Sequence, residues 1–132
     1  MKRYLVVLLV AGGFALGAKA YAHHSFAATY LEDQSVTIEG ELVQFLFRNP
    51  HSFVHVMVKE KDGTQVRYAV EWGGAGQLGG QGVSRETLKP GDIVTISGSP
   101  GRNPADHRLR MVSLRRAKDG FGWGQKPGEV VE

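Results

Sequence analysis

The sequence predicts an all-β fold, a small OB-like barrel of five strands with one short helical turn between the third and fourth strands. Five segments rich in β-branched and aromatic residues are separated by turns that contain Gly or Pro. Their order, a long bent strand, a hairpin, an insertion and two further strands, is that of the OB fold. A small open β-sandwich fits the same pattern. The 132 residues include no cysteine, so disulfides cannot support either fold.

The N-terminal residues have the pattern of a cleaved signal peptide, which we predict over residues 1–22. Lys2 and Arg3 precede an apolar run, residues 5–18, that is shorter than the roughly 20 residues needed to cross a bilayer. Ala20 and Ala22 then supply small residues at the −3 and −1 positions of a cleavage site. We therefore expect a periplasmic protein with no membrane anchor after cleavage.

Cleavage also changes the charge balance. The full chain has 16 Lys and Arg against 13 Asp and Glu, a formal net charge of +3. Lys2, Arg3 and Lys19 lie in the predicted signal segment, so 13 basic residues face 13 acidic residues in the mature chain. A neutral domain lacks the basic surface typical of nucleic-acid-binding proteins, and we expect no nucleic-acid partner.

The first strand is predicted over residues 36–47, with Gly40 in its interior. Apolar residues occupy one face before Gly40 and both faces after it. This pattern is typical of a bent strand that is shared by two halves of a sheet. Arg48-Asn49-Pro50 then ends the strand, because proline has no amide hydrogen to donate.

The remaining elements follow from alternation and turn residues. Asp62-Gly63 marks a hairpin turn, and Ser84 is the N-cap of a helical turn over residues 84–88. The further strands are predicted over residues 53–59, 65–72, 93–98 and 109–116. The barrel domain is therefore expected over residues 23–118. Residues 119–132, rich in polar side chains, Gly and Pro, are expected to form a flexible tail.

The glycine-rich residues 74–79 match the G-x-G-x-x-G pattern of dinucleotide-binding proteins. Gly80 and Gly82 oppose the helix that such a site requires, and the chain is too small for the βαβ fold that carries it. We therefore interpret residues 73–82 as a mobile loop, a flap over one mouth of the barrel. No nucleophile elbow or catalytic triad is present in the sequence pattern, and enzymatic activity is not predicted.

Two of the five histidines, His23 and His24, stand at the predicted mature N-terminus. The α-amine and the imidazole of His23 can chelate one metal ion, and a second imidazole adds a third nitrogen ligand. Such a ligand set suits Cu(II), with Zn(II) and Ni(II) behind it. Cleavage two residues earlier would leave Tyr21-Ala22-His23, which also chelates Cu(II).

A third ligand is expected from the second strand. His51 and His55 lie on the same face, about 13 Å apart in a regular strand, so at most one of them joins the site. His51 is at the exposed entry of the strand, whereas His55 is flanked by Phe53 and Met57. The predicted metal ligands are therefore His23, His24 and His51, with copper as the metal, provided that the fold brings them together.

Two other functions fit the sequence. A non-catalytic OB-like binding module would hold a small ligand, a saccharide or a partner protein. Its contact surface would comprise Tyr68, Trp72, the loop 73–82 and the Arg-rich last strand. The third candidate is an accessory subunit of a periplasmic redox enzyme, which would bind a protein partner.

Four motifs occur in order: His23-His24-Ser25-Phe26, Arg48-Asn49-Pro50-His51-Ser52-Phe53, Tyr68-Ala69-Val70-Glu71 and Leu88-Lys89-Pro90-Gly91-Asp92. Together they resemble an uncharacterised family of exported bacterial proteins, a domain of unknown function whose members begin with HHSF and carry an NPHS segment. The resemblance spans residues 23–116. It implies a periplasmic location and a small β domain, and it brings no established activity.

Overall fold

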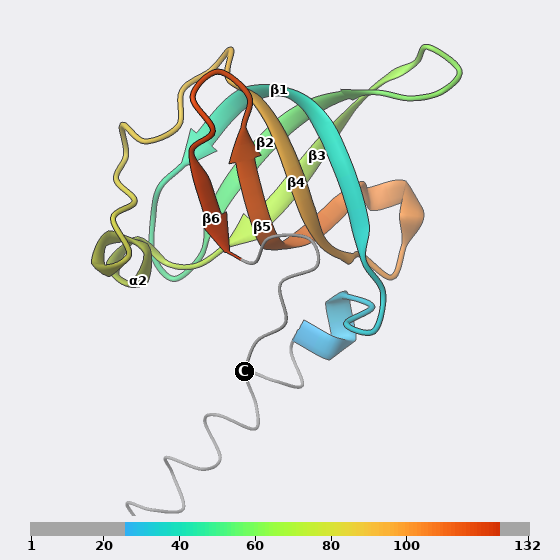
Figure 1. The fold of residues 1–132 in the computed structure, drawn as a ribbon. Coiled ribbons are helices and arrows are strands. Elements are labelled where there is room, and N and C mark those ends of the chain that lie inside the picture. Colours follow the sequence, from blue (N-terminus) through green and yellow to red (C-terminus); the bar gives the residue numbers. More distant parts are fainter. Residues whose placement is uncertain (1–25, 125–132) are drawn as a thin grey trace, which may run out of the picture.

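The computed structural model describes residues 26–124 (Figure 1). The predicted signal peptide over residues 1–22, His23, His24 and residues 125–132 lie outside the described part. The strands are β1 (Val36–Leu46), β2 (Ser52–Lys59), β3 (Gln65–Trp72), β4 (Ile93–Pro100), β5 (Arg108–Arg116) and β6 (Gly122–Gly124). Between them lie the short helix α2 (Ala75–Gly80) and the 3-10 turn η1 (Pro104–Asp106).

The strands form one sheet that closes on itself. Their order is β3-β2-β1-β4-β5-β6, and an additional pairing joins β3 to β5. That pairing is parallel and short, from Ala69 with Arg108 to Glu71 with Arg110. Because it joins the two ends of a five-stranded sheet, β1 to β5 make a closed barrel (Figure 1), and the predicted OB-like barrel is confirmed.

The long strand β1 has the predicted role of linking two halves of the sheet. Its residues 36–41 pair with β4, and its residues 40–46 pair with β2. Gly40 lies where both partners meet, and a Cβ at this position would approach Val56 Cγ1 to 2.8 Å. The irregularity in register falls between Leu42 and Gln44, just after the glycine.

The core fills the barrel with alternate side chains. On β2 the predicted inward face, Val54, Val56 and Val58, is buried. Leu42 and Leu114 are fully buried on β1 and β5. Because every strand contributes its inward residues to the same interior, the hydrophobic burial that stabilises the fold depends on barrel closure.

The short helix lies elsewhere than the sequence indicated. Residues 84–88 form a turn, in which Ser84 Oγ accepts from the Glu86 amide, and the helix is Ala75–Gly80. The glycine-rich stretch is therefore helical rather than a loop, because Leu78 is fully buried in the core. Burial of an apolar side chain outweighs the poor helix propensity of glycine. No helix in residues 26–124 is long and apolar enough to cross a membrane.

The expected tail begins with ordered structure. Gly122–Gly124 forms β6, which pairs with β5 at residues 113–115. Trp123 packs against the barrel core, and Phe121 does so too. A strand of three residues, two of which are glycine, carries no periodicity, so its pairing depends on the partner strand and not on local sequence.

Candidate functional site

A cavity of about 270 Å³ lies at the end of the barrel where β3 and β5 separate. Past Glu71, β3 ends at Trp72, whereas β5 continues and pairs with β6 instead. The opening between them is bordered by the β1–β2 loop, by α2 and by the chain before β1. The lining residues are Phe26, Pro50, His51, Glu71, Trp72, Gly73, Gly74, Gln77, Arg110, Met111 and Trp123.

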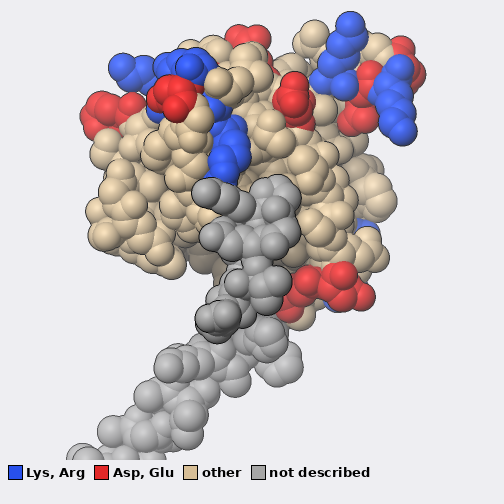
Figure 2. All heavy atoms as spheres, in the orientation of Figure 1, with Lys and Arg blue, Asp and Glu red and all other residues tan. Residues whose placement is uncertain are grey.

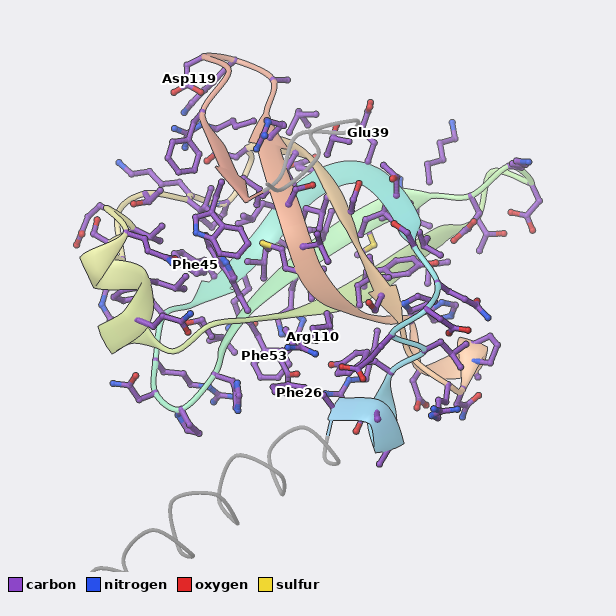
Figure 3. The ribbon with its side chains drawn as sticks, turned by 60° about the horizontal axis from the view of Figure 1, so that its bottom comes forward. Phe26, Glu39, Phe45, Phe53, Arg110 and Asp119 are labelled. Carbon is purple, nitrogen blue, oxygen red and sulfur yellow. The ribbon has the colours of Figure 1, made fainter. Side chains whose placement is uncertain are left out.

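The first described residues pack beside this cavity. Residues 26–29 form a helical turn, and Tyr30, which follows it, pairs with Gly101. The ring of Phe26 meets the His51 imidazole edge-on, with 5.7 Å between ring centroids. The guanidinium of Arg110 lies 3.8 Å from the centroid of the Phe26 ring, and Figure 3 shows these two side chains side by side. Phe26 is therefore held between the β1–β2 loop and β5.

The β1–β2 loop, which carries His51, is hydrogen-bonded to the start of α2. The Asn49 Oδ1 accepts from the Gly76 amide at 3.2 Å, and the Arg48 carbonyl accepts from the Ala75 amide at 3.0 Å. Ser52 is fully buried, and its hydroxyl bonds to the backbone of Arg48. The Asn-Pro-His-Ser motif thus fixes the position of His51 at the cavity.

The other two described histidines lie away from His51. His55 Nδ1 accepts from Arg67 Nε at 3.2 Å on the outer face of the sheet. Partial burial lowers the pKa of His55, and the positive charges of Arg67 and Arg48 lower it further. His107 packs against Tyr68 at 5.3 Å. Within residues 26–124, no three His, Cys, Asp or Glu side chains form a group that could hold a metal ion.

Glu71 and Trp72 bring polar groups to the cavity wall. The Glu71 carboxylate pairs with Arg108 at 3.9 Å, and Arg110 pairs with Glu32 at 2.8 Å. Glu71 Oε2 and Trp72 Nε1 are buried, and neither has a hydrogen-bond partner among the described residues. Tyr30 lies near Glu71; burial raises its pKa to about 12, and the negative charge of Glu71 contributes to the increase.

Aromatic rings complete the wall. Trp72 and Trp123 meet edge-on at 5.1 Å, and Trp123 Nε1 donates to Gln81 Oε1 at 3.0 Å. Phe45 lies 5.9 Å from Trp72 on the inner side. The sequence indicated Trp72, the stretch 73–82 and the Arg-rich strand as a contact surface, and all three contribute to the cavity. Tyr68, from the same set, lies instead beside His107, where both residues line a second cavity.

Sequence reasoning missed Phe26, Glu71 and Trp123 as lining residues. Phe26 and Glu71 belong to the motifs behind the family resemblance, and that association was the available signal. Trp123 was assigned to the tail, and no local pattern distinguishes it from a solvent-exposed residue there.

The family model for a family of unknown function, DUF6152, matches residues 13–110. The chain belongs to the DUF6152 family. The resemblance to an uncharacterised family is thereby confirmed, with the small β domain that it implied. No curated protein matches the sequence.

One solved structure similar to this DUF6152 protein is a mitochondrial single-stranded DNA-binding protein from S. cerevisiae. The two chains share 16% identity with a TM-score of 0.49, over 66% of this chain and 96% of that chain. The likeness carries no argument about what this chain binds. The expectation that a nucleic-acid partner is absent rested on the neutral charge balance alone, and this match to a single-stranded DNA-binding protein overturns it.

Charges of opposite sign are intermixed on the visible surface of the DUF6152 protein. Figure 2 shows Lys and Arg side chains next to Asp and Glu on this face. Among the ion pairs of the described residues, Arg116 pairs with Asp92 and Asp119, and Lys118 pairs with Asp92. These pairs connect the turn before β4 to the hairpin before β6, so their role is structural.

Proposed function

We propose that this DUF6152 protein is a periplasmic metal-binding module with copper as its preferred metal. In this proposal the α-amine and imidazole of His23, together with His24 and His51, supply the ligands. The export signal predicted over residues 1–22 creates the free amine and sets the compartment. Nitrogen donors of this kind favour Cu(II), which stands at the top of the divalent affinity series.

The packing of Phe26 on His51 is the observation that supports this proposal. Phe26 is three residues after His23 and two after His24 in the sequence. Consecutive Cα atoms are about 3.8 Å apart, so the Cα of His23 lies within about 11 Å of that of Phe26. The ring of Phe26 in turn contacts the His51 imidazole. Only two residues separate His23 from the residue whose ring contacts His51, and this short separation supports the proposal.

The position of His51 suits a ligand. Its imidazole lines a cavity, and its loop is fixed through Asn49 and Ser52. A ligand whose backbone is already ordered loses less conformational entropy on metal binding. The nearby positive charge of Arg110 is balanced by Glu32, which limits its repulsion of a cation.

Titration of the exported protein with Cu(II), followed by quenching of tryptophan fluorescence, tests the proposal. Both tryptophans line the cavity beside His51, so a bound Cu(II) ion quenches them. We expect His51→Ala to weaken binding roughly tenfold or more, since it removes one of the nitrogen ligands. The variant His23→Ala/His24→Ala/His51→Ala is expected to lose the site.

His55→Ala is the matched control. It removes an imidazole from β2, four residues after His51, that is already bonded to Arg67. Its Cu(II) affinity should equal that of the wild type. Unaltered affinity in the triple variant would rule out this site.

The second candidate is a non-catalytic module that binds a small ligand. The cavity favours this function, because Trp72, the stretch 73–82 and Arg110 of the last predicted strand all line it. Buried polar atoms without partners among the described residues lie behind its wall. Titration with Cu(II) does not test this function. A titration with small organic ligands, followed by tryptophan fluorescence, tests it directly.

A further inference from the structure

We propose that the cavity between β3 and β5 binds a single uncharged sugar ring. The proposal goes beyond metal binding and does not depend on His23 or His24. It rests on the charge balance of the wall, on its hydrogen-bonding groups and on its aromatic rings.

The charged groups of the wall are neutralised within the protein. Glu71 pairs with Arg108, and Arg110 pairs with Glu32 while its guanidinium covers Phe26. An ionic ligand would have to displace one of these partners. A neutral ligand keeps both pairs, so the wall favours an uncharged molecule.

The wall nevertheless has hydrogen-bonding capacity of both kinds. Gln77 and His51 each offer a donor and an acceptor when His51 is neutral, and the Glu71 carboxylate accepts. Behind the wall, Glu71 Oε2 lacks a donor and Trp72 Nε1 lacks an acceptor among the described residues. Both atoms are buried, and Tyr30 Oη, which also lacks a partner among the described residues, lies near Glu71; a ligand reaches these atoms only where side chains rotate on binding. A hydroxyl group satisfies either atom, because it donates and accepts.

Shape and apolar surface point to a ring. Phe26, Trp72 and Trp123 contribute aromatic surface, on which the C–H face of a sugar packs. The volume of about 270 Å³ is slightly below the roughly 300 Å³ at which pockets for drug-sized ligands begin. One pyranose unit with its several hydroxyls combines the size, the neutrality and the mixed hydrogen bonding that the wall requires.

Intrinsic fluorescence of the full exported protein gives a direct assay, since both tryptophans of the chain line the cavity. The probes are glucose, galactose and N-acetylglucosamine, then maltotriose and chitotriose, with glycerol as a polyol that lacks a ring. We expect a saturable change with at least one sugar and none with glycerol. Tighter binding of a trisaccharide indicates the end of a glycan, and equal binding indicates a free monosaccharide.

Two variants with matched controls locate the site. Glu71→Gln is expected to weaken sugar binding about tenfold, and Gln77→Ala, on the exposed side of α2, about threefold. Glu39→Gln and Gln65→Ala make the same changes at exposed positions outside the cavity, and both should bind like the wild type. Figure 3 shows Glu39 far from Phe26 and Arg110. Gln77→Ala keeps the test valid if Glu71→Gln unfolds.

Saturable sugar binding that is weakened by Gln77→Ala and retained by His23→Ala/His24→Ala supports the proposal independently of copper. The absence of a saturable change with every sugar would overturn it. Binding that Gln77→Ala leaves unchanged would also overturn it, because the sugar would then occupy another surface.

Discussion

At the scale of single residues, the Asn-Pro-His-Ser motif explains why the backbone of His51 has a fixed position at the cavity. Asn49 accepts from the amide of Gly76, Ser52 bonds back to Arg48, and His51 lies between them at the cavity. The Asn49 carboxamide thus satisfies one of the free amides in the first turn of α2 from outside the helix. The polar residues of the motif are therefore structural, and the histidine is the member left available for chemistry.

Gly74 gives a prediction at this scale. A Cβ at Gly74 would lie 2.6 Å from the Pro50 carbonyl oxygen and 2.8 Å from Asn49 Oδ1. The β1–β2 loop must therefore move away from the start of α2. We expect Gly74→Ala to lower the free energy of unfolding by about 1–3 kcal/mol, as overpacking does. Urea denaturation measures the change.

Gly79→Ala is the control for this prediction. A Cβ at Gly79 meets nothing within 4 Å, and alanine favours a helix by up to about 1 kcal/mol over glycine. This variant should be as stable as the wild type or more stable. Equal stability of the Gly74→Ala and Gly79→Ala proteins would show that the β1–β2 loop moves away from α2 without lowering the free energy of unfolding.

At the scale of elements, β6 depends on the ion pairs that hold its hairpin. Arg116 donates to Asp92 and Asp119 at 3.1 and 2.9 Å and to the Thr87 carbonyl at 2.6 Å. Its guanidinium also lies 5.2 Å from the Phe121 ring. One side chain thus joins the turn before β4, the end of β5 and the hairpin that leads to Trp123.

The pH dependence of this contact follows from Asp119. The hydrogen bond from Arg116 lowers the pKa of Asp119 from 3.8 to about 2. A carboxyl group with a lowered pKa stabilises the folded state above its unfolded pKa, and this stabilisation is lost as the pH falls through the folded value. We expect Asp119→Asn to be less stable than the wild type at pH 7, with a difference that shrinks between about pH 4 and pH 2.

Urea unfolding at several pH values measures this convergence. Asp33→Asn serves as the control, since Asp33 is exposed and forms no ion pair within residues 26–124. Its stability difference from the wild type should not follow the Asp119 titration. A constant difference for Asp119→Asn across this range would show that the ion pair does not stabilise the hairpin.

At the scale of the whole molecule, the proposed metal site depends on processing of the chain. The α-amine of His23 is a ligand only after residues 1–22 are removed. We expect the exported protein to begin at His23, or at Tyr21 after the earlier cleavage, as read from its intact mass. The variant Ala20→Tyr/Ala22→Tyr blocks both cleavage sites, because small residues are required at −3 and −1.

The uncleaved variant should bind Cu(II) roughly tenfold more weakly or worse, since the amine ligand is absent. Its barrel should unfold at the same urea concentration as that of the wild type, because residues 26–124 carry the core. Copper affinity equal to that of the cleaved protein would contradict the role of the free amine.

Much of the fold could be predicted from particular local patterns. Val54, Val56 and Val58 alternate with polar or half-buried neighbours, and this alternation located β2 and its inner face. Gly40 marked the strand that two sheet halves share. The helix was misplaced because glycine is a poor helix former, and the buried contact of Leu78 that favours it comes from distant residues.

The sequence by itself determined the strands, their inward faces, the family and the pattern of an export signal, because each depends on residues close together in the chain. Only the tertiary structure decided that β3 meets β5, that Trp123 lies against Trp72, and that Phe26 packs on His51. These contacts join segments up to 51 residues apart, and their partners are selected by barrel closure. Local periodicity specifies which face of a strand is buried, whereas packing of the whole chain specifies what covers it.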